Sequence, residues 1–531
     1  MPALFLFEAG RNIKFCIAFT IFSWYNTISA GINGVLKMGS ERVISLRSFS
    51  ISSPVIPHQN FIFIQEGTTS YMKKEVQALG YLPDERPSTW KLFLYAIQQV
   101  IVMFPATVTV ALITGFQVST TIFASGLATL CFILITGKKI PMYYGSSFAY
   151  LTAIASMCAA QGFEKVDGIL PTEAIQNAQF GIILSGLVSI VAGILVRFCG
   201  RNAVEKILPA SITGPVAMII GLTLAGNALG DAIPNVATPD ASTNCWVIVS
   251  MITLISTILY SKYLKGFLGQ LPLLLGAATG CLAAAIIYFV GDVNLFRAMP
   301  AAALDASLWK LGDGSIFAVP ALSFPKANWE AVVAIMPIAI ATIPESTAHM
   351  YQLDIYVNDI AKKKGSDKKY NLIDLLDRNL IGDGICDMIS GVVGGPAGTN
   401  YGENISTMAI TKVFSVPVMA VAAIVAMVIS FFTPLIQVIY GIPLAVIGGL
   451  EIYLFGAIAA QGIAIMIDKG VDMFSSKNIA IIASIMVIGI GGNYAFGGNI
   501  PFFGMQVPCI AGAAIFGIIL NLLLSIGEKK K

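Results

Sequence analysis

The stretch Gly394-Gly-Pro-Ala-Gly-Thr-Asn-Tyr-Gly-Glu-Asn-Ile-Ser-Thr-Met-Ala409 lies in a hydrophobic region, yet its first half is rich in helix-breaking residues. Gly394, Gly395 and Pro396 are unfavourable inside a continuous spanning helix. The carboxylate of Glu403 follows, and the apolar pattern then resumes. This order predicts extended backbone that leads to the N-terminus of a half-helix. Irregular backbone at membrane depth is tolerated where it lines a cavity, and a helix N-terminus offers free N–H groups to a ligand.

The composition around this stretch is that of a membrane protein. Of the 531 residues, 56% are hydrophobic and only 11% are charged, whereas about a quarter of the residues of a soluble protein are charged. The chain is therefore predicted to be an all-α polytopic membrane protein. Its eight cysteines show no CxxC spacing, which favours buried thiols over disulfides or a metal site. The net charge of +3 gives no reason to expect a nucleic-acid partner.

Apolar segments follow one another from residue 90 onward, and we expect fourteen transmembrane segments. The first seven run at 90–114, 119–136, 144–160, 176–197, 205–226, 244–261 and 271–291, and the second seven at 329–351, 372–394, 401–414, 416–437, 442–464, 478–496 and 508–526.

The distribution of Lys and Arg tests this count, because cytoplasmic loops carry the excess of positive charge. With fourteen segments, the basic groups at 73–91, 138–139, 197–206, 262–265, 362–369, 412, 469–477 and 529–531 fall on one side, and outside the long loop after the seventh segment Lys165 is the exception. We therefore expect both termini to be cytoplasmic.

The two halves of the chain share a repeated sequence pattern. The third and the tenth segments are both entered through interrupted stretches, at 139–148 and 396–403. Each is the third of a set of seven, and seven is odd, so the sets have opposite orientations. Such a pair indicates the binding site of a secondary transporter. We expect two inverted repeats, at 86–292 and 329–527, separated by an external loop at 293–328.

Residues 1–85 are treated as an uncertain N-terminal extension. The apolar run at 15–32 is short for a membrane span and is interrupted by polar residues. Met72 offers an alternative translation start, which leaves open whether residues 1–71 belong to the mature protein.

Three titratable side chains stand out inside the predicted segments. Glu345 and His349 are four residues apart and share a helix face, and Glu403 lies at the start of the second half-helix. Ionisable groups in spans usually face a cavity or a partner. The stretches Ile343–Tyr351 and Gly394–Ala409 contain no Lys or Arg, which suits a neutral ligand with N–H donors better than an anion. A carboxylate or imidazole that titrates on loading would couple transport to protons. We find no catalytic motif and predict no enzyme, no metal and no cofactor other than the proton.

The chain resembles the nucleobase–ascorbate transporter family, also called nucleobase–cation symporters of the second type, and within it the uracil permeases. The resemblance covers nearly everything from residue 90 to residue 525. It rests on Gly145-Ser-Ser-Phe-Ala149, Glu345-Ser-Thr-Ala-His349, Thr399-Asn-Tyr-Gly-Glu-Asn-Ile405, Met408-Ala-Ile-Thr-Lys412 and Val471-Asp472.

This resemblance implies a core domain (segments 1–4 and 8–11) and a gate domain (segments 5–7 and 12–14). It implies proton symport of uracil by alternating access in the plasma membrane, and a possible homodimer through the gate domain. The implied substrate-binding residues are Glu345, Glu403, Gly402, Phe148 and Tyr401, and the implied proton-coupling residues are His349, Glu345 and Glu403.

Three positions depart from the family pattern, and two alternative functions stay open. Gln98-Gln99 stands where Gln-His is frequent, Ser406 replaces a Gly, and Pro105 stands where a Gly is common. The first departure removes a titratable group from the first segment. The alternatives are a xanthine or purine permease on the same fold and, less favoured, an anion transporter.

Overall fold

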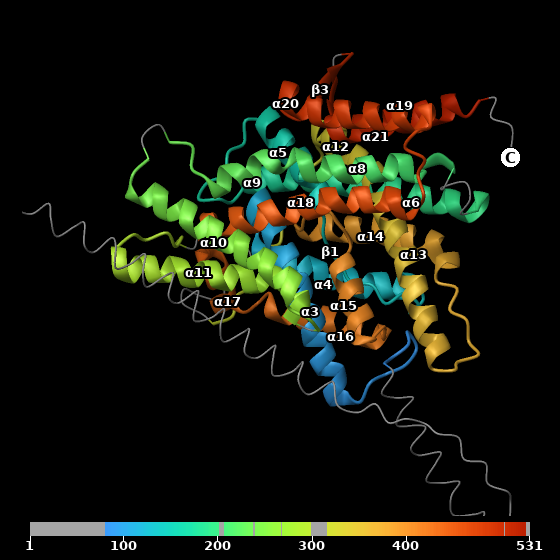
Figure 1. Cartoon of the computed structure of the whole chain (residues 1–531), viewed down its shortest axis with the longest axis horizontal. Helices are drawn as coiled ribbons and strands as arrows, with labels where there is room; N and C mark the ends of the chain where they lie inside the picture. Colours follow the sequence, from blue (N-terminus) through green and yellow to red (C-terminus); the bar gives the residue numbers. More distant parts are fainter. Residues whose placement is uncertain are drawn as a thin grey trace, which may run out of the picture. The chain divides into compact units, whose positions relative to one another are not determined.

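The structure is a computed structural model that describes residues 80–200, 206–236, 239–266, 268–298, 316–503 and 505–526. The uncertain extension before residue 80 and most of the predicted loop at 293–328 lie outside these residues. The described chain is almost entirely helical (Figure 1). The helices of its first half are α3 (Thr89–Thr114), α4 (Val118–Ile135), α5 (Leu151–Ala160), α6 (Thr172–Cys199), α8 (Ala210–Thr223), α9 (Ala225–Ala232), α10 (Ala241–Tyr263) and α11 (Pro272–Gly291).

The second half repeats this helical pattern. Its helices are α12 (Trp329–Ile335), α13 (Ala339–Lys363), α14 (Leu376–Val393), α15 (Gly402–Thr411), α16 (Val416–Ile429), α17 (Thr433–Gly441), α18 (Leu444–Asp468), α19 (Ser476–Met486), α20 (Gly492–Phe496) and α21 (Cys509–Leu524). Short 3-10 turns precede α5, α11, α13 and α14, and a π-helical turn at Val487–Gly491 joins α19 to α20.

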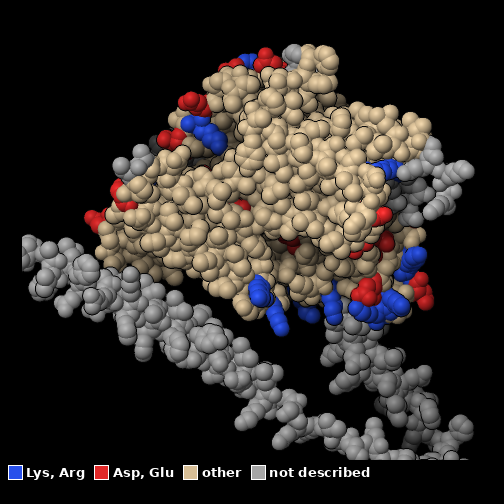
Figure 2. All heavy atoms as spheres, turned by 45° about the horizontal axis from the view of Figure 1, so that its top comes forward, with Lys and Arg blue, Asp and Glu red and all other residues tan. Residues whose placement is uncertain are grey.

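The surface fits a protein that spans a membrane. Within the described ranges, nine helices are long and apolar enough to cross a bilayer. Large hydrophobic side chains such as Phe289, Val290 and Phe198 are exposed on them. Figure 2 shows a broad surface almost free of charged side chains, with Lys and Arg gathered along its lower edge. Apolar surface of this extent belongs in lipid rather than in water, so the chain is a multi-pass membrane protein.

Two short strands lie where extended backbone was predicted. Strand β1 (Tyr144–Ser146) pairs antiparallel with β2 (Gly398–Asn400), and Gly145 is opposite Thr399. Each strand is followed by a ten-residue helix, α5 or α15. A second antiparallel pair, β3 (Asn499–Phe502) with β4 (Met505–Pro508), was not predicted and lies in an expected loop.

One predicted segment differs clearly from the structure. The sequence predicted that the eighth segment ends at residue 351, but α13 continues to Lys363. A 3-10 turn at Met336–Ile338, which contains Pro337, separates α12 from α13, whereas Pro344 lies inside α13. The helix continues past residue 351 because Leu353 and Val357 are fully buried against the core.

Close backbone contacts between glycines fix the main helix pairs. A Cβ atom on Gly186 in α6 would lie 2.3 Å from the carbonyl oxygen of Gly384 in α14. A Cβ atom on Gly462 in α18 would lie 2.4 Å from the carbonyl oxygen of Gly214 in α8. Small residues allow this approach, which drives helix association in lipid. Each pair is the centre of one packed group of helices, α3–α6 with α12–α17 around the first and α8–α11 with α18–α21 around the second.

Candidate functional site

The site is built on the β1–β2 pair, whose backbone groups are satisfied by neighbouring helices. On α4, Thr129 and Ser125 donate to the carbonyl oxygen of Tyr144 over 3.1 and 2.7 Å, and the Tyr144 N–H donates back to Thr129. Buried backbone groups without such partners would be costly. The strands can therefore hold extended backbone in the interior of the protein.

Tyr401 closes the strand pair from one side. Its ring covers Gly145 so closely that a Cβ atom there would lie 2.4 Å from the ring. Its hydroxyl donates to the carbonyl oxygen of Ser146 over 3.0 Å and is 2.9 Å from the hydroxyl of Thr107 on α3. Tyr401 lines the cavity described below, but the structure gives its hydroxyl a role in holding β1 and α3 together.

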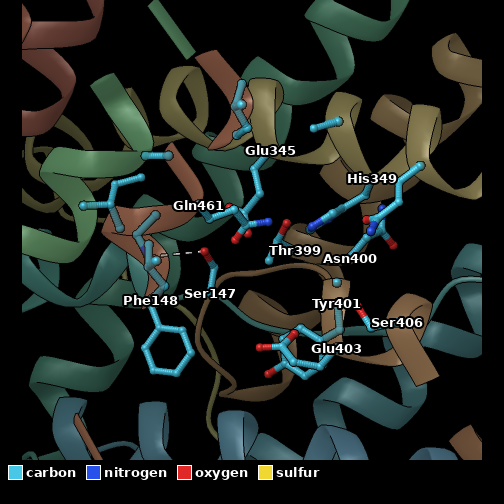
Figure 3. A pocket seen from close by; sticks show the side chains of 18 of the residues that line it. Ser147, Phe148, Glu345, His349, Thr399, Asn400, Tyr401, Glu403, Ser406 and Gln461 are labelled. Carbon is cyan, nitrogen blue, oxygen red and sulfur yellow. Dashed lines mark hydrogen bonds between the residues drawn. The ribbon is translucent and has the colours of Figure 1, made fainter. Parts of the chain in front are cut away.

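A cavity of about 350 Å³ lies beside the strands, within the size range of small-molecule pockets. Figure 3 shows side chains from both halves of the chain around it. All six predicted site residues line it: Phe148, Glu345, His349, Tyr401, Gly402 and Glu403. The N-terminal ends of the half-helices meet there, since α15 begins at Gly402 and the 3-10 turn before α5 begins at Phe148.

The histidine and a glycine of the second half-helix are in contact. A Cβ atom on Gly402 would lie 2.8 Å from Nε2 of His349, so the ring rests against the backbone at the start of α15. His349 is buried, and its Nδ1 has no hydrogen-bond partner among the described residues. The absence of a side chain at residue 402 therefore lets α13 and α15 approach at the cavity.

Glu345 and Glu403 reach the cavity from different helices. Glu345 lies one turn before His349 on α13, and Glu403 is the second residue of α15. Within the described part of the chain, no other side chain forms a hydrogen bond with either carboxylate, and both residues line the cavity (Figure 3). Their acceptor oxygens are available to a ligand that carries N–H donors.

Two other acidic residues of the interior are fully engaged. On α14, Asp383 accepts from the Ser346 hydroxyl and, over 2.7 Å, from the side-chain amide of Asn400. Asp387 accepts from the Tyr144 hydroxyl and, over 2.8 Å, from the N–H of Gly398. These two residues therefore connect α13, α14 and both strands.

The first helix is joined to the second half-helix by an amide pair. Asn404 donates to the side-chain oxygen of Gln99 over 2.8 Å and to its backbone oxygen over 3.0 Å. Gln99 is buried on α3, at the position where a His is frequent in the family. The Gln99 amide therefore forms the contact between α3 and the start of α15. This contact fixes the start of α15, which carries Glu403.

A second cavity of about 540 Å³ adjoins the first and shares four of its lining residues, Thr213, Pro344, Ala348 and Ile465. It ends among the polar residues Lys469, Asp472 and Asn478. Together the two cavities form a path from the site toward the α18–α19 connection.

Several polar lining residues were not singled out from the sequence: Ser146, Ser147, Thr213, Gln270, Gln352, Thr399, Asn400 and Gln461. Thr399 and Asn400 stand in the motif block, but nothing in their spacing distinguished them from Tyr401. Gln461 left a clearer signal, because it is an amide within the apolar run of α18. Within the described ranges, no three His, Cys, Asp or Glu side chains form a group that could hold a metal ion.

Comparisons with known proteins agree with this architecture. Residues 90–498 match the sequence profile of a family described as a permease family. The chain is 36% identical over 443 residues to the uracil permease of Bacillus caldolyticus, which covers 83% of this chain and 93% of that protein. It is 34% identical to the uracil permease of Bacillus subtilis (85% and 96% covered) and 31% identical to that of Escherichia coli K12 (83% and 93%).

Solved structures share the fold at much lower identity. The transmembrane domain of a cyanobacterial bicarbonate transporter, BicA, aligns with a TM-score of 0.52 at 14% identity, covering 82% of this chain and 96% of that domain. The murine anion transporter Solute Carrier 26 family member A9 aligns with a TM-score of 0.59 at 11% identity, covering 92% and 77%. The matching relatives are named permeases, so the chain is a transporter and not an enzyme. It belongs to this permease family, the nucleobase–ascorbate transporters that its motifs resemble.

Proposed function

We propose that this protein is a secondary active transporter that imports a nucleobase, with uracil as the first candidate, by proton symport and alternating access. The observation that carries the proposal is the cavity in which Glu345, Glu403 and the starts of both half-helices face one space. Carboxylates accept hydrogen bonds from ring N–H groups, and backbone N–H groups donate to ring carbonyls. Uracil carries both kinds of group, and several relatives are named uracil permeases.

The helix contacts support two inverted repeats of seven segments. If each segment corresponds to the one seven positions later, contacts should occur in matched pairs, and they do. Helix α6 packs on α14 as α4 packs on α16, α10 packs on α18 as α8 packs on α19, α10 packs on α11 as α19 packs on α21, and α5 packs on α12 as α3 packs on α15. The antiparallel β1–β2 pair is consistent with a two-fold axis between the halves. This correspondence supports fourteen transmembrane spans, seven in each repeat.

The same contacts support a core domain and a gate domain. The core domain consists of α3–α6 and α12–α17, and it carries Glu345, His349 and Glu403. The gate domain consists of α8–α11 and α18–α21, and it lines the opposite side of the cavity. With Lys469 on the cytoplasmic side, as the positive-inside pattern predicts, the second cavity opens the site toward the cytoplasm. Movement of the core domain along the gate domain would then expose the site alternately to each side.

Proton coupling is assigned to Glu345, His349 and Glu403. These are titratable groups of the cavity, and a proton taken up by one of them on loading would travel with the base. The resemblance adds a homodimer through the gate domain and a plasma-membrane location with both termini cytoplasmic. Cross-linking of cysteine pairs placed on the gate domain in native membranes would test the dimer.

The proposal is tested by uptake of labelled uracil into proteoliposomes, with and without an inward proton gradient. We expect the gradient to accelerate uptake, and a protonophore to remove the acceleration. Uracil uptake at the same rate with and without the gradient would reject proton symport but would still support uracil as the substrate. The absence of uracil uptake by folded protein would reject the assigned substrate.

Two alternatives are separated by their substrates. Excess xanthine that suppresses uracil uptake would favour a purine carrier on the same fold. An anion transporter is suggested by the two solved structures that share the fold. The cavity lining, however, contains no Lys or Arg among the described residues, and a permanent anion would lack a counter-charge there. Bicarbonate or chloride flux in the same proteoliposomes would support that alternative.

A further inference from the structure

The two walls of the cavity differ in chemistry. The core wall carries Glu345, His349, Glu403 and the half-helix termini, whereas the gate wall is mainly apolar. Its side chains from α8 and α18 are Thr213, Ala217, Ile220, Ile458, Gln461 and Ile465. Among these six, Gln461 is the one that ends in an amide, and Gln270, in the turn before α11, is a second amide that the gate domain contributes to the lining.

Gln461 is held in place by the packing of its helix. Ile458, Gln461 and Ile465 have the spacing of one helix face, and all three line the cavity. The next residue, Gly462, touches Gly214 backbone to backbone, which leaves α18 little freedom to rotate. Gln461 and Glu345 line the same cavity, the first from the gate domain and the second from the core domain (Figure 3).

Glu345 has a hydrogen-bond partner in the loaded carrier, because the ligand supplies one, but it loses that partner in the empty carrier. When a base is bound, its N–H groups satisfy Glu345. After release, Glu345 must pass the apolar gate wall as the core domain returns, and a buried polar group without a partner is costly. Gln461 can relieve this cost in either protonation state, because its NH₂ donates to a carboxylate and its C=O accepts from a carboxylic acid.

We propose that Gln461 takes the place of the ligand beside Glu345 while the empty carrier returns, an inference that rests on the proposed transport function. Gln461 is thus a positioning residue of the gate domain. Its removal should slow the step that occurs without ligand and spare the steps that occur with ligand.

The test compares two kinds of transport in proteoliposomes. Net uptake of labelled uracil under an inward proton gradient requires the empty return, whereas exchange of labelled external uracil for unlabelled internal uracil does not. Gln461→Met keeps the length of the side chain and removes both hydrogen-bonding groups. We expect net uptake by Gln461→Met to fall at least tenfold, while exchange stays within about twofold of wild type.

Two further variants keep the test decisive. Gln461→Asn retains the amide on a shorter stem and should give an intermediate net uptake, which also covers the case in which the Met variant does not fold. Gln437→Met makes the same chemical change on the exposed face of α17, outside the cavity, and should leave both rates unchanged.

The outcomes separate this inference from the proposed function. Net uptake and exchange that fall together in the Gln461 variants, or that both stay at wild-type rates, would overturn the role of Gln461. Wild-type protein that neither accumulates nor exchanges uracil would instead overturn the proposed substrate.

Discussion

Two pairs of acidic residues lie in the same interior and have opposite surroundings. Asp383 and Asp387 on α14 accept hydrogen bonds from both strands and from α13. Glu345 and Glu403 line the cavity, and within the described residues no other side chain forms a hydrogen bond with them. Acidic residues at membrane depth are costly in either setting. The hydrogen bonds give the first pair a structural role, and the position of the second pair supports our proposal that it binds the ligand.

The largest effect is expected where a structural carboxylate is removed. Asp387→Ala would leave the Tyr144 hydroxyl and the Gly398 N–H buried without an acceptor, at about 1–3 kcal/mol each. We expect little folded protein, measured by monodispersity on size-exclusion chromatography and by thermal denaturation in detergent. Asp387→Asn keeps one acceptor oxygen and should fold better. If Asp387→Ala denatures at the wild-type temperature, the structural role of this pair is wrong.

The next effect is large for transport and small for stability. Glu345→Ala removes an acceptor that has no recorded partner among the described residues, so the fold loses little. We expect the melting temperature without ligand to stay near that of wild type, while the initial rate of uracil uptake falls about ten- to a hundredfold, because a hydrogen bond to a charged group contributes about 1.5–3 kcal/mol. If Glu345→Ala lowered the melting temperature as much as Asp387→Ala does, the proposed difference in role between the two acidic pairs would be wrong.

A smaller effect is expected at the contact between α13 and α15. In Gly402→Ala, the new methyl group would lie 2.8 Å from Nε2 of His349, so the ring or the start of α15 must shift. We expect uracil affinity to fall about tenfold and the melting temperature to change little, measured by calorimetry on the same samples. The matched control is Gly456→Ala on α18, where no neighbouring atom lies within 4 Å. Equal affinities for the two variants would show that residue 402 does not shape the site.

The smallest effect concerns an acidic residue outside the membrane. Burial alone would raise the pKa of Asp84, but hydrogen bonds from Lys368 and Tyr370 lower the pKa below its ordinary value of 3.8. The stabilisation is therefore present above that value and is lost as the pH falls through the lowered pKa. Asp84→Asn should cost at most about 1 kcal/mol at neutral pH, since the ion pair with Lys368 is exposed.

The check is a comparison of melting temperatures across pH. We expect the difference between wild type and Asp84→Asn to be present at pH 6 and to shrink below pH 3.8. If the difference in melting temperature between wild type and Asp84→Asn increased as the pH falls, the assigned direction of the Asp84 pKa shift would be wrong.

Much of the fold could be predicted from the sequence because lipid imposes simple requirements. Apolar length and the breakers at Gly394 and Pro396 identified the helices, the strand before α15 and the half-helix after it. The same reasoning identified Glu345, His349 and Glu403, which the structure brings to one cavity. Charged groups inside apolar segments are rare enough to stand out one at a time.

The rest depended on contacts that one sequence does not encode locally. Pro337 and Pro344 look alike in the sequence, but the burial of Leu353 and Val357 keeps α13 helical past the second proline. Asp383 and Glu345 are both carboxylates inside apolar segments. The structure distinguishes them, because Asp383 accepts hydrogen bonds from Ser346 and Asn400 whereas Glu345 lines the cavity. Gln461 belongs to the site because Gly462 packs against Gly214, which is a pairing between distant segments.

The most direct test of the account is a binding measurement by isothermal titration calorimetry. Uracil would be titrated into purified wild-type protein and into Glu403→Ala, after thermal denaturation has shown that both are folded. We predict one uracil bound per chain in the wild type and no measurable binding by Glu403→Ala. Wild-type affinity in the folded variant would contradict the assignment of the half-helix cavity as the nucleobase site.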